Sequence, residues 1–442
     1  MLDLLYALVL AAVVGYTVFR ERPALALTSL MLMSFILFYG IGHFVFYADA
    51  EAVPLVQERV TVSLVMTWIA LLAGIEAARV LWPRLAARQQ RLFEQWPTLP
   101  VRNEHPASDA LLLMAGLAAA LVIWGTFVAL GKPSQISSFI SIESALGKQD
   151  FRLEEAGGGG YLYQTLIASA GPFLSILLLA KGKAGAGRMF VFTGAVLAAA
   201  VFAGKLGTFH KVPWLIFIVQ LLVAHRMLLS RRLQFSGILL MSLVVVLGTL
   251  AAAKIALPEL DAVGLLQWVG YRFFEVNNEV VYQTFYVYPD YLPHTWGMNI
   301  GLVHRIFSDG PLISAHTNVA NFFGAFGATF DPFYIGDAWV DFGYGGVIGV
   351  SVVVGFIVKM LDLHIARLGK SPLAIALTAG SVYGVFQLQV TSAFTAFLSG
   401  GLLSIPLAVG SFSAIVRRLK RSLEALRIPA SHSSRGVEQG GT

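Results

Sequence analysis

The sequence predicts an all-α, polytopic membrane protein with about eleven transmembrane helices, since each crossing of a bilayer needs roughly 20 apolar residues. Of its 442 residues, 57% are hydrophobic and only 13% are charged, whereas a soluble globular domain carries about 25% charged residues. Apolar runs of spanning length recur along the chain, and basic residues gather in short clusters beside them. We therefore expect a single membrane domain over residues 1–427 and a disordered polar tail over residues 428–442.

The order of apolar runs and basic clusters predicts the topology. The first run, residues 4–19, has no basic residue before it and is followed by Arg20 and Arg22. This is the reverse of a signal peptide, so we expect the run to remain as the first helix. Because basic flanks favour the cytoplasm, the amino terminus is expected outside and the carboxyl terminus inside. The expected helices cover residues 4–19, 24–47, 60–82, 110–130, 162–180, 189–204, 212–224, 233–256, 345–365, 372–390 and 401–416.

Composition also excludes several kinds of chemistry. The chain has no cysteine, which excludes disulfides, thiolate metal sites and a cysteine nucleophile. Its formal charge of +6 comes from clusters that orient membrane helices, so nucleic acid is not an expected partner. The histidines in residues 257–344 show no HxxxH or HxH spacing, and we expect neither a metal nor another cofactor.

A long polar-rich interval, residues 257–344, interrupts the apolar runs and is expected to lie outside, in the periplasm. Within it, residues 265–288 predict an amphipathic helix. At 100° per residue its polar side chains fall within an arc of about 100°. They are Arg272, Glu275, Glu279, Tyr282, Gln283 and Tyr286. We expect the opposite side to pack against lipid or other helices, and this face to meet something polar.

Several basic residues lie on the side of the membrane that is expected to be outside, although basic residues near membrane helices usually favour the cytoplasm. Arginine binds phosphate through two parallel hydrogen bonds and lysine supplies a point charge, so these residues are the expected contacts for a diphosphate. They are Lys205, His210 and Lys211 in "GKLGTFHK", and Arg272 and Arg305 in the long loop. Two alternatives remain open: the lysines snorkel to outer head groups, and Arg272 only forms an i,i+3 pair with Glu275.

Two carboxylates one helical turn apart, Glu275 and Glu279, disfavour each other's ionisation, so one of them is expected to act as a general base. A sugar hydroxyl is a poor nucleophile until its proton is accepted, and a diphosphate leaving group needs positive charge nearby. His304 and His316 are the alternative bases. The expected sugar contacts are Tyr282, Asn278 and Asp337.

Three segments carry a resemblance: "GKLGTFHK", "YRFFEVNNEVVYQTF" and "TNVANFFGAFGATFDPFYIGDAWVDFGYGGVIGV". Over residues 189–416 the chain resembles the O-antigen and enterobacterial-common-antigen polymerase family, the Wzy-type polymerases of oligosaccharide repeat units. The resemblance would place lipid-diphosphate contacts on Arg272 and on the group of Lys205, His210 and Lys211. Related chains usually carry arginine at that helix end, and here two lysines and a histidine stand instead.

The resemblance implies a GT-C-like glycosyltransferase of the bacterial inner membrane. Such an enzyme transfers a glycan from polyprenyl (undecaprenyl) diphosphate to another lipid-linked repeat unit, for O-antigen or exopolysaccharide synthesis. It releases polyprenyl diphosphate. A chain-length regulator protein and membrane lipid are the other expected partners.

Competing functions predict different features. An O-antigen ligase would share the helices, the loop and the donor, but would transfer to lipid A core and rely on one dominant loop histidine, for which His304 and His316 qualify. A secondary transporter would need charged or broken segments at mid-membrane, and the sequence shows few, since Glu76, Lys254 and Lys359 lie near the ends of expected helices. A scaffold accounts for the hydrophobicity but not for the charged outer face.

Overall fold

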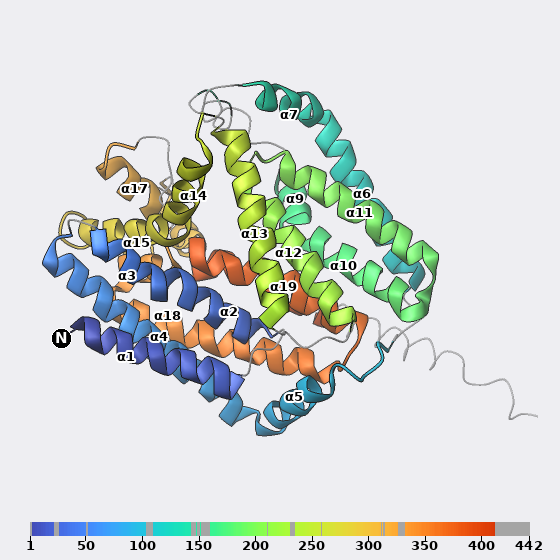
Figure 1. The fold of residues 1–442 in the computed structure, drawn as a ribbon, viewed down its shortest axis with the longest axis horizontal. Helices are drawn as coiled ribbons and strands as arrows, with labels where there is room; N and C mark the ends of the chain where they lie inside the picture. The colour runs from blue at the N-terminus through green and yellow to red at the C-terminus, as the bar shows by residue number, and fades with distance from the viewer. Residues whose placement is uncertain are drawn as a thin grey trace, which may run out of the picture.

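The computed structural model of the chain describes residues 2–21, 26–49, 52–102, 109–142, 147, 151, 160–209, 211–229, 235–257, 259–310, 312, 314–325 and 332–411. Regular structure in these ranges is helical throughout, as the sequence predicts. Figure 1 shows the helices packed as one bundle, with a group of shorter helices at one end. A backbone surrounded by lipid must satisfy its own hydrogen bonds, which is why apolar runs of this length form helices.

Eight helical segments within the described residues are long and apolar enough to cross a membrane. They are Leu2–Glu21 (α1 and η1), Leu27–Ala48 (α2, η2 and most of α3), Pro54–Leu81 (α4), Asp109–Ala129 (α6), Gly160–Ala186 (α9, η4, α10 and η5), Arg188–Leu206 (α11), Tyr334–Arg367 (α18) and Pro372–Val390 (α19). These helices confirm an all-helical, multi-pass membrane protein.

Three further expected spans are less complete. The helices α12 (Lys211–Leu228) and α13 (Phe235–Ala256) contain shorter apolar stretches, Val212–Leu228 and Val245–Ile255. The last expected helix, residues 401–416, is helical over residues 404–411, where the described part of the chain ends. The total of about eleven spans and the GT-C-like arrangement stay predictions.

The helices α4 and α18 approach each other closely because glycines line their contact. A Cβ atom added to Gly74 would lie 2.1 Å from the carbonyl oxygen of Val352, and one added to Gly355 would lie 2.3 Å from that of Leu71. No real Cβ fits at these distances. Small residues at such positions let two membrane helices approach until their backbones touch, which strengthens packing where lipid removes the hydrophobic driving force.

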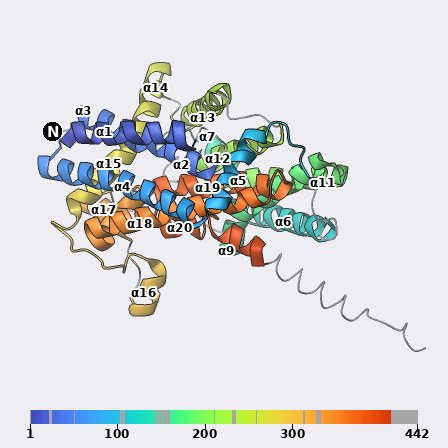
Figure 2. The ribbon, with the colours of Figure 1, turned by 90° about the horizontal axis from the view of Figure 1, so that it is seen from below.

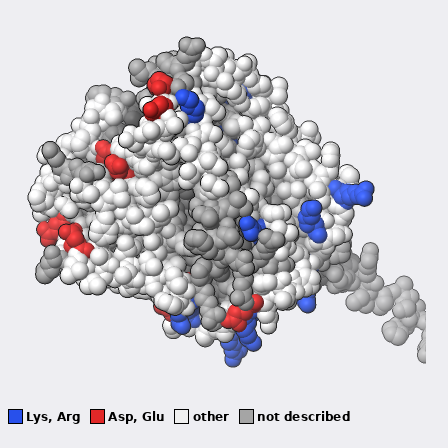
Figure 3. All heavy atoms as spheres, in the orientation of Figure 1, with Lys and Arg blue, Asp and Glu red and all other residues white. Residues whose placement is uncertain are grey.

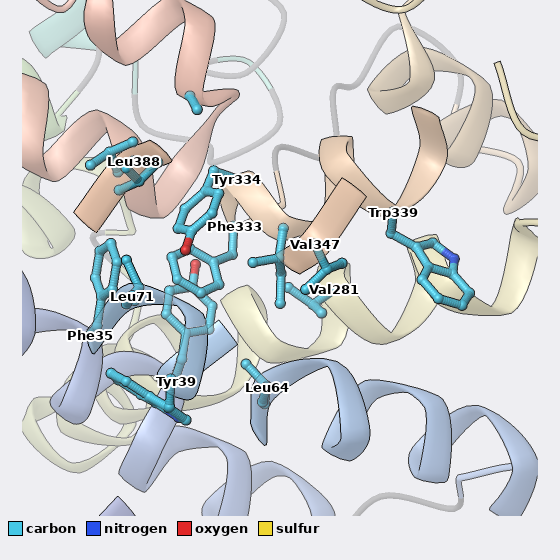
Figure 4. Packing of buried hydrophobic residues seen from close by; sticks show 14 of the residues in the cluster. Phe35, Tyr39, Leu64, Leu71, Val281, Phe333, Tyr334, Trp339, Val347 and Leu388 are labelled. Atoms are coloured by element: carbon cyan, nitrogen blue, oxygen red, sulfur yellow. The ribbon is translucent and has the colours of Figure 1, made fainter. Parts of the chain in front are cut away.

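A cluster of aromatic rings joins the first helices to the start of α18. The ring of Tyr39 stacks on that of Phe333 with centroids 3.9 Å apart, and Phe35 meets Phe333 edge-on at 4.7 Å. Figure 4 shows these rings facing each other from α2, η2 and the entry to α18, with Tyr334 beside them. The fully buried cluster therefore anchors the end of the long loop to the bundle.

The two ends of the bundle differ in charge. At one end, called the α5 end, Lys370 donates hydrogen bonds to the carbonyl oxygens of Trp96 and Leu99, and Arg88 donates to that of Arg367. This ties α5 (Pro83–Gln95) to the turn between α18 and α19. The opposite end, which we call the loop end, carries most of the short helices of the long polar loop, residues 257–344 (Figure 1). Figure 3 shows acidic side chains over the loop end and basic ones concentrated toward the α5 end.

A network of buried charges connects the first helices with α18 near the α5 end. Lys359 on α18 donates to both carboxylate oxygens of Glu21 at 2.9 and 3.2 Å, and Arg79 donates to the same residue at 2.7 Å. Arg79 also pairs with Glu76 at 2.6 Å. Lys359 and Glu76 were counted among the few charges that a transporter would need. In the structure they belong to ion pairs that join three helices.

Candidate functional site

The predicted amphipathic helix exists, with a change in register. It runs through α14 (Ala262–Gly270), η6 (Tyr271–Glu275) and α15 (Val276–Val287) without interruption. The middle segment is π-helical, and such a turn takes one more residue than an α-helical turn. The uniform step of 100° per residue, which put Arg272 and the later polar residues in one arc, is therefore wrong across this segment.

Arg272 and the two glutamates have separate surroundings. The guanidinium of Arg272 is exposed and lies over the Trp268 ring, 5.3 Å from its centroid. Glu279 accepts hydrogen bonds from the Tyr271 hydroxyl at 2.9 Å and from Gln283 at 3.1 Å. Within the described residues Arg272 and Glu275 form no ion pair, so the alternative of a simple i,i+3 pair is not what the structure shows.

The Tyr271 hydroxyl adds an electrostatic feature to this helix. Burial raises the pKa of Tyr271, and the hydrogen bond to the Glu279 carboxylate raises it further. The phenol therefore stays protonated and keeps donating to Glu279, which leaves that carboxylate with two donors. Glu275 is half-buried at the end of the π turn, and its predicted role as a base stays a prediction.

The predicted sugar contacts on α15 have structural partners. Asn278 is buried and donates both amide hydrogens to backbone carbonyls, that of Phe38 at 2.9 Å and that of Phe274 at 2.8 Å. The hydroxyl of Tyr282 accepts a hydrogen bond from the backbone amide of Val53 at 2.9 Å. These contacts tie α15 to η2 (Ile36–Ile41) and to the entry of α4. They account for Asn278 without any ligand.

A different group of polar residues comes together where α17 (Ala315–Phe322) meets the first turn of α18. His316 Nε2 lies 3.2 Å from Asp337 Oδ1, and the two side chains are 12% and 8% exposed. Asn299 donates to the same oxygen of Asp337 at 2.6 Å and accepts from the backbone amide of Ala315 at 2.9 Å. We call Asn299, His316, Asp337 and Asp341 the loop cluster.

Asp341 organises the turn that carries Asn299. Its Oδ1 accepts hydrogen bonds from the Thr295 hydroxyl at 2.5 Å and from the backbone amide of Gly297 at 3.1 Å. One helical turn earlier, Asp337 Oδ2 is buried and has no hydrogen-bond partner among the described residues. Because an unpaired buried carboxylate oxygen is costly, such an atom marks a place where a ligand or water completes the site.

The remaining histidine and arginine of the loop lie on α16 (Gly301–Phe307). His304 Nε2 is 2.8 Å from the carbonyl oxygen of Gly310, and Arg305 is exposed. Figure 2 shows α16 standing out from the bundle. His304 is thus held within its own loop, whereas His316 is held against a carboxylate.

The basic helix end is described in part. Lys205, on the last turn of α11, is 1% exposed. Its ammonium lies 3.3 Å from the carbonyl oxygen of Ala168 and 4.8 Å from the centroid of the Tyr383 ring. No carboxylate among the described residues pairs with it. His210 and the side chain of Lys211 lie outside the described residues.

Sequence reasoning named two members of the loop cluster, His316 and Asp337, but assigned them different roles. It missed Asn299, which carries no local signal because its partners lie 16 and 38 residues away. Tyr383 beside Lys205 was missed for the same reason. In the described part of the chain, no three His, Asp or Glu side chains lie together in a way that could hold a metal ion.

Comparison of the chain with protein-family models, with curated proteins and with solved structures finds no match. The class of the protein is therefore defined by its fold alone: it is a multi-pass helical membrane protein with a polar cluster at the loop end.

Proposed function

We propose that the protein is a membrane glycosyltransferase that polymerises oligosaccharide repeat units carried on polyprenyl diphosphate. The single observation that carries the proposal is the pairing of His316 with Asp337 beside a carboxylate oxygen that has no partner among the described residues. The pair lies on helices of the loop end, next to the first turn of a membrane span. That position suits a reaction between a membrane-bound donor and a polar acceptor.

In the proposed reaction an acceptor hydroxyl attacks the anomeric carbon of the donor sugar. The bond between that carbon and the diphosphate oxygen breaks, polyprenyl diphosphate leaves with the electron pair, and the hydroxyl proton passes to the base. If His316 donates its Nε2 hydrogen to Asp337, the lone pair of the neutral imidazole is on Nδ1, and the carboxylate stabilises the imidazolium that forms. His316 is therefore a better supported base than Glu275.

Charge for the leaving group is available from two residues. The exposed guanidinium of Arg272 rests one face on Trp268 and leaves its N–H edges for phosphate oxygens. Lys205 offers a buried ammonium whose contacts among the described residues are a carbonyl oxygen and an aromatic ring. Arg272 is proposed as the initial contact for the lipid diphosphate. Lys205 is proposed to stabilise the negative charge that develops on the diphosphate as it leaves.

A ligase that transfers the glycan to lipid A core is the second candidate. The specific observation in its favour is that one loop histidine, His316, is singled out by its pairing with Asp337. The two functions differ in the acceptor alone. Replacement of His316 by glutamine is expected to impair both the polymerase and the ligase reaction.

The test uses the purified protein in lipid nanodiscs with polyprenyl-diphosphate-linked repeat units from its own host. A polymerase makes a ladder of longer lipid-linked glycans and releases polyprenyl diphosphate, and a ligase releases it only after lipid A core is added. His316→Gln is expected to reduce product by about 10²-fold or more, the usual contribution of a general base. His304→Gln is the matched control and should stay active. Absence of product with either acceptor would refute the proposed function.

A further inference from the structure

The short helix α16 and the turn before it expose large apolar side chains. Trp296 is 72% exposed, Ile306 66% and Phe307 74%. Large apolar residues exposed to this degree elsewhere, such as Phe19 at 82% and Leu121 at 72%, belong to the candidate membrane spans. The α16 surface therefore resembles the lipid-facing surface of the bundle more than that of a loop in water.

This apolar surface continues into an exposed side of α18. The rings of Trp296 and Phe342 lie 6.3 Å apart, and a Cβ atom on Gly297 would meet both Phe342 at 3.3 Å and Val303 of α16 at 3.9 Å. The backbone of α18 breaks at Phe342 and Gly343, and on the helical segment that follows Tyr344 and Ile348 are exposed one turn apart. Through Trp296 and Phe342 the α16 surface therefore contacts the beginning of the part of α18 that is long enough to cross the membrane.

The polar groups of α16 suit a membrane surface. Arg305 is exposed next to Ile306, where a guanidinium can reach lipid phosphates while the apolar neighbour enters the chain region. Tryptophan is enriched at this depth because its ring is apolar and its N–H is polar. Figure 2 shows that α16 extends away from the bundle, so neighbouring helices do not cover these side chains.

We propose that α16 and Trp296 lie in the head-group layer of the bilayer, in the leaflet at the loop end. Ile306, Phe307 and Trp296 enter the apolar region, and Arg305 contacts lipid phosphates. The segment then fixes the height of the turn that holds Asn299, three residues beyond Trp296, and with it the height of the loop cluster above the membrane. Arg305 was predicted as a diphosphate contact, and this placement assigns it to bilayer lipid.

The test uses the absence of cysteine from the natural chain. Single cysteines at Ile306 and Phe307 are labelled with a nitrobenzoxadiazole fluorophore in nanodiscs that contain phosphatidylcholine with a nitroxide near the head group. Ile348→Cys on the exposed side of α18 is the positive control, and Asn321→Cys at the exposed end of α17 is the negative control. Because these side chains are exposed, the variants are expected to fold, which thermal unfolding checks.

The expected result is a blue-shifted emission at positions 306 and 307, with nitroxide quenching comparable to that at position 348. Emission and quenching like those at position 321 would overturn the proposal. A blue shift without quenching by lipid, together with disulfide cross-linking between two copies at position 306, would instead assign the surface to contact with a second copy. The readout does not involve catalysis, so it is independent of the proposed function.

Discussion

The imidazole of His316 and the carboxylate of Asp337 lie 3.2 Å apart, on two helices that the sequence connects through residues 323–333. Asn299 donates to the same oxygen at 2.6 Å and helps to hold the carboxylate in place. An imidazole held in this way keeps one tautomer and gains stabilisation when it takes up a proton. The geometry is the basis of the first prediction.

Asp337→Asn is expected to lower glycan transfer by about 10²-fold or more, because the amide preserves the shape but removes the charge that stabilises protonated His316. Asn299 can still donate to the remaining carbonyl oxygen, so the variant is expected to fold. Product formation in nanodiscs measures the effect. Asp309→Asn, at an exposed position after α16, is the control. Normal turnover of Asp337→Asn would remove the loop cluster from the proposed mechanism.

Arg272→Lys is expected to weaken the reaction substantially, as is Arg272→Ala, because lysine retains the charge but cannot form two parallel hydrogen bonds to phosphate. Arg305→Lys is the matched control: it keeps the charge at a position that we assign to bilayer lipid, and turnover is expected to be unchanged. Initial rates at several donor concentrations measure both variants. A normal rate for Arg272→Lys would contradict the proposal that Arg272 holds the diphosphate through two parallel hydrogen bonds.

Lys205→Met should separate function from stability. The buried ammonium costs free energy to desolvate and has no carboxylate partner among the described residues, so an apolar chain of similar length should leave the unfolding temperature unchanged or higher. Glycan transfer should fall. Lys181→Met is the control, since Lys181 pairs with Asp109 and its loss should lower the unfolding temperature. A Lys205→Met protein that is less stable and fully active per folded molecule would make this lysine structural.

Gly355→Ala is expected to destabilise the bundle by about 1–3 kcal/mol, as overpacking does, because the new methyl group meets the Leu71 backbone. Gly349, on the same helix, has no atom within 4 Å of an added Cβ. Gly349→Ala is therefore expected to change stability by less than about 1 kcal/mol. Tryptophan fluorescence during heating at one fixed scan rate compares the two. Equal unfolding temperatures for Gly355→Ala and Gly349→Ala would contradict the prediction, because they would show that α4 and α18 can move apart to accept the methyl group at little cost.

The orientation in the membrane is tested by adding single cysteines to the cysteine-free chain. Gln95, at the end of α5, is expected to react with an impermeant thiol reagent only after the inner membrane is opened. Asp290, which pairs with Arg59 at the loop end, is expected to react in intact spheroplasts. The reverse pattern would put the loop cluster in the cytoplasm and rule out a periplasmic polymerase.

Local sequence features predicted most of the helices. The helix predicted over residues 372–390 has the same bounds as α19, where Ser371 caps the first turn and Pro372 begins it. The helix predicted from residue 345 agrees with the part of α18 that follows a break at Phe342 and Gly343, whose backbone angles are not helical, and a separate helical segment precedes it from Tyr334. That earlier segment was not expected to be helical, because aspartates such as Asp337 and Asp341 are common in turns. They are accommodated in a helix because Asn299, His316 and Thr295 partner their carboxylates.

By itself the sequence determined the class of protein, the approximate helix bounds and the position of the polar loop, because hydrophobic runs, caps and basic flanks act over a few residues along the chain. Tertiary structure alone decided which polar residues meet. Lys359 pairs with Glu21 across 338 positions, and His316 pairs with Asp337 while Glu279 is held by Tyr271 and Gln283. Such contacts depend on how helices pack and where a π turn shifts the register, which no local periodicity records.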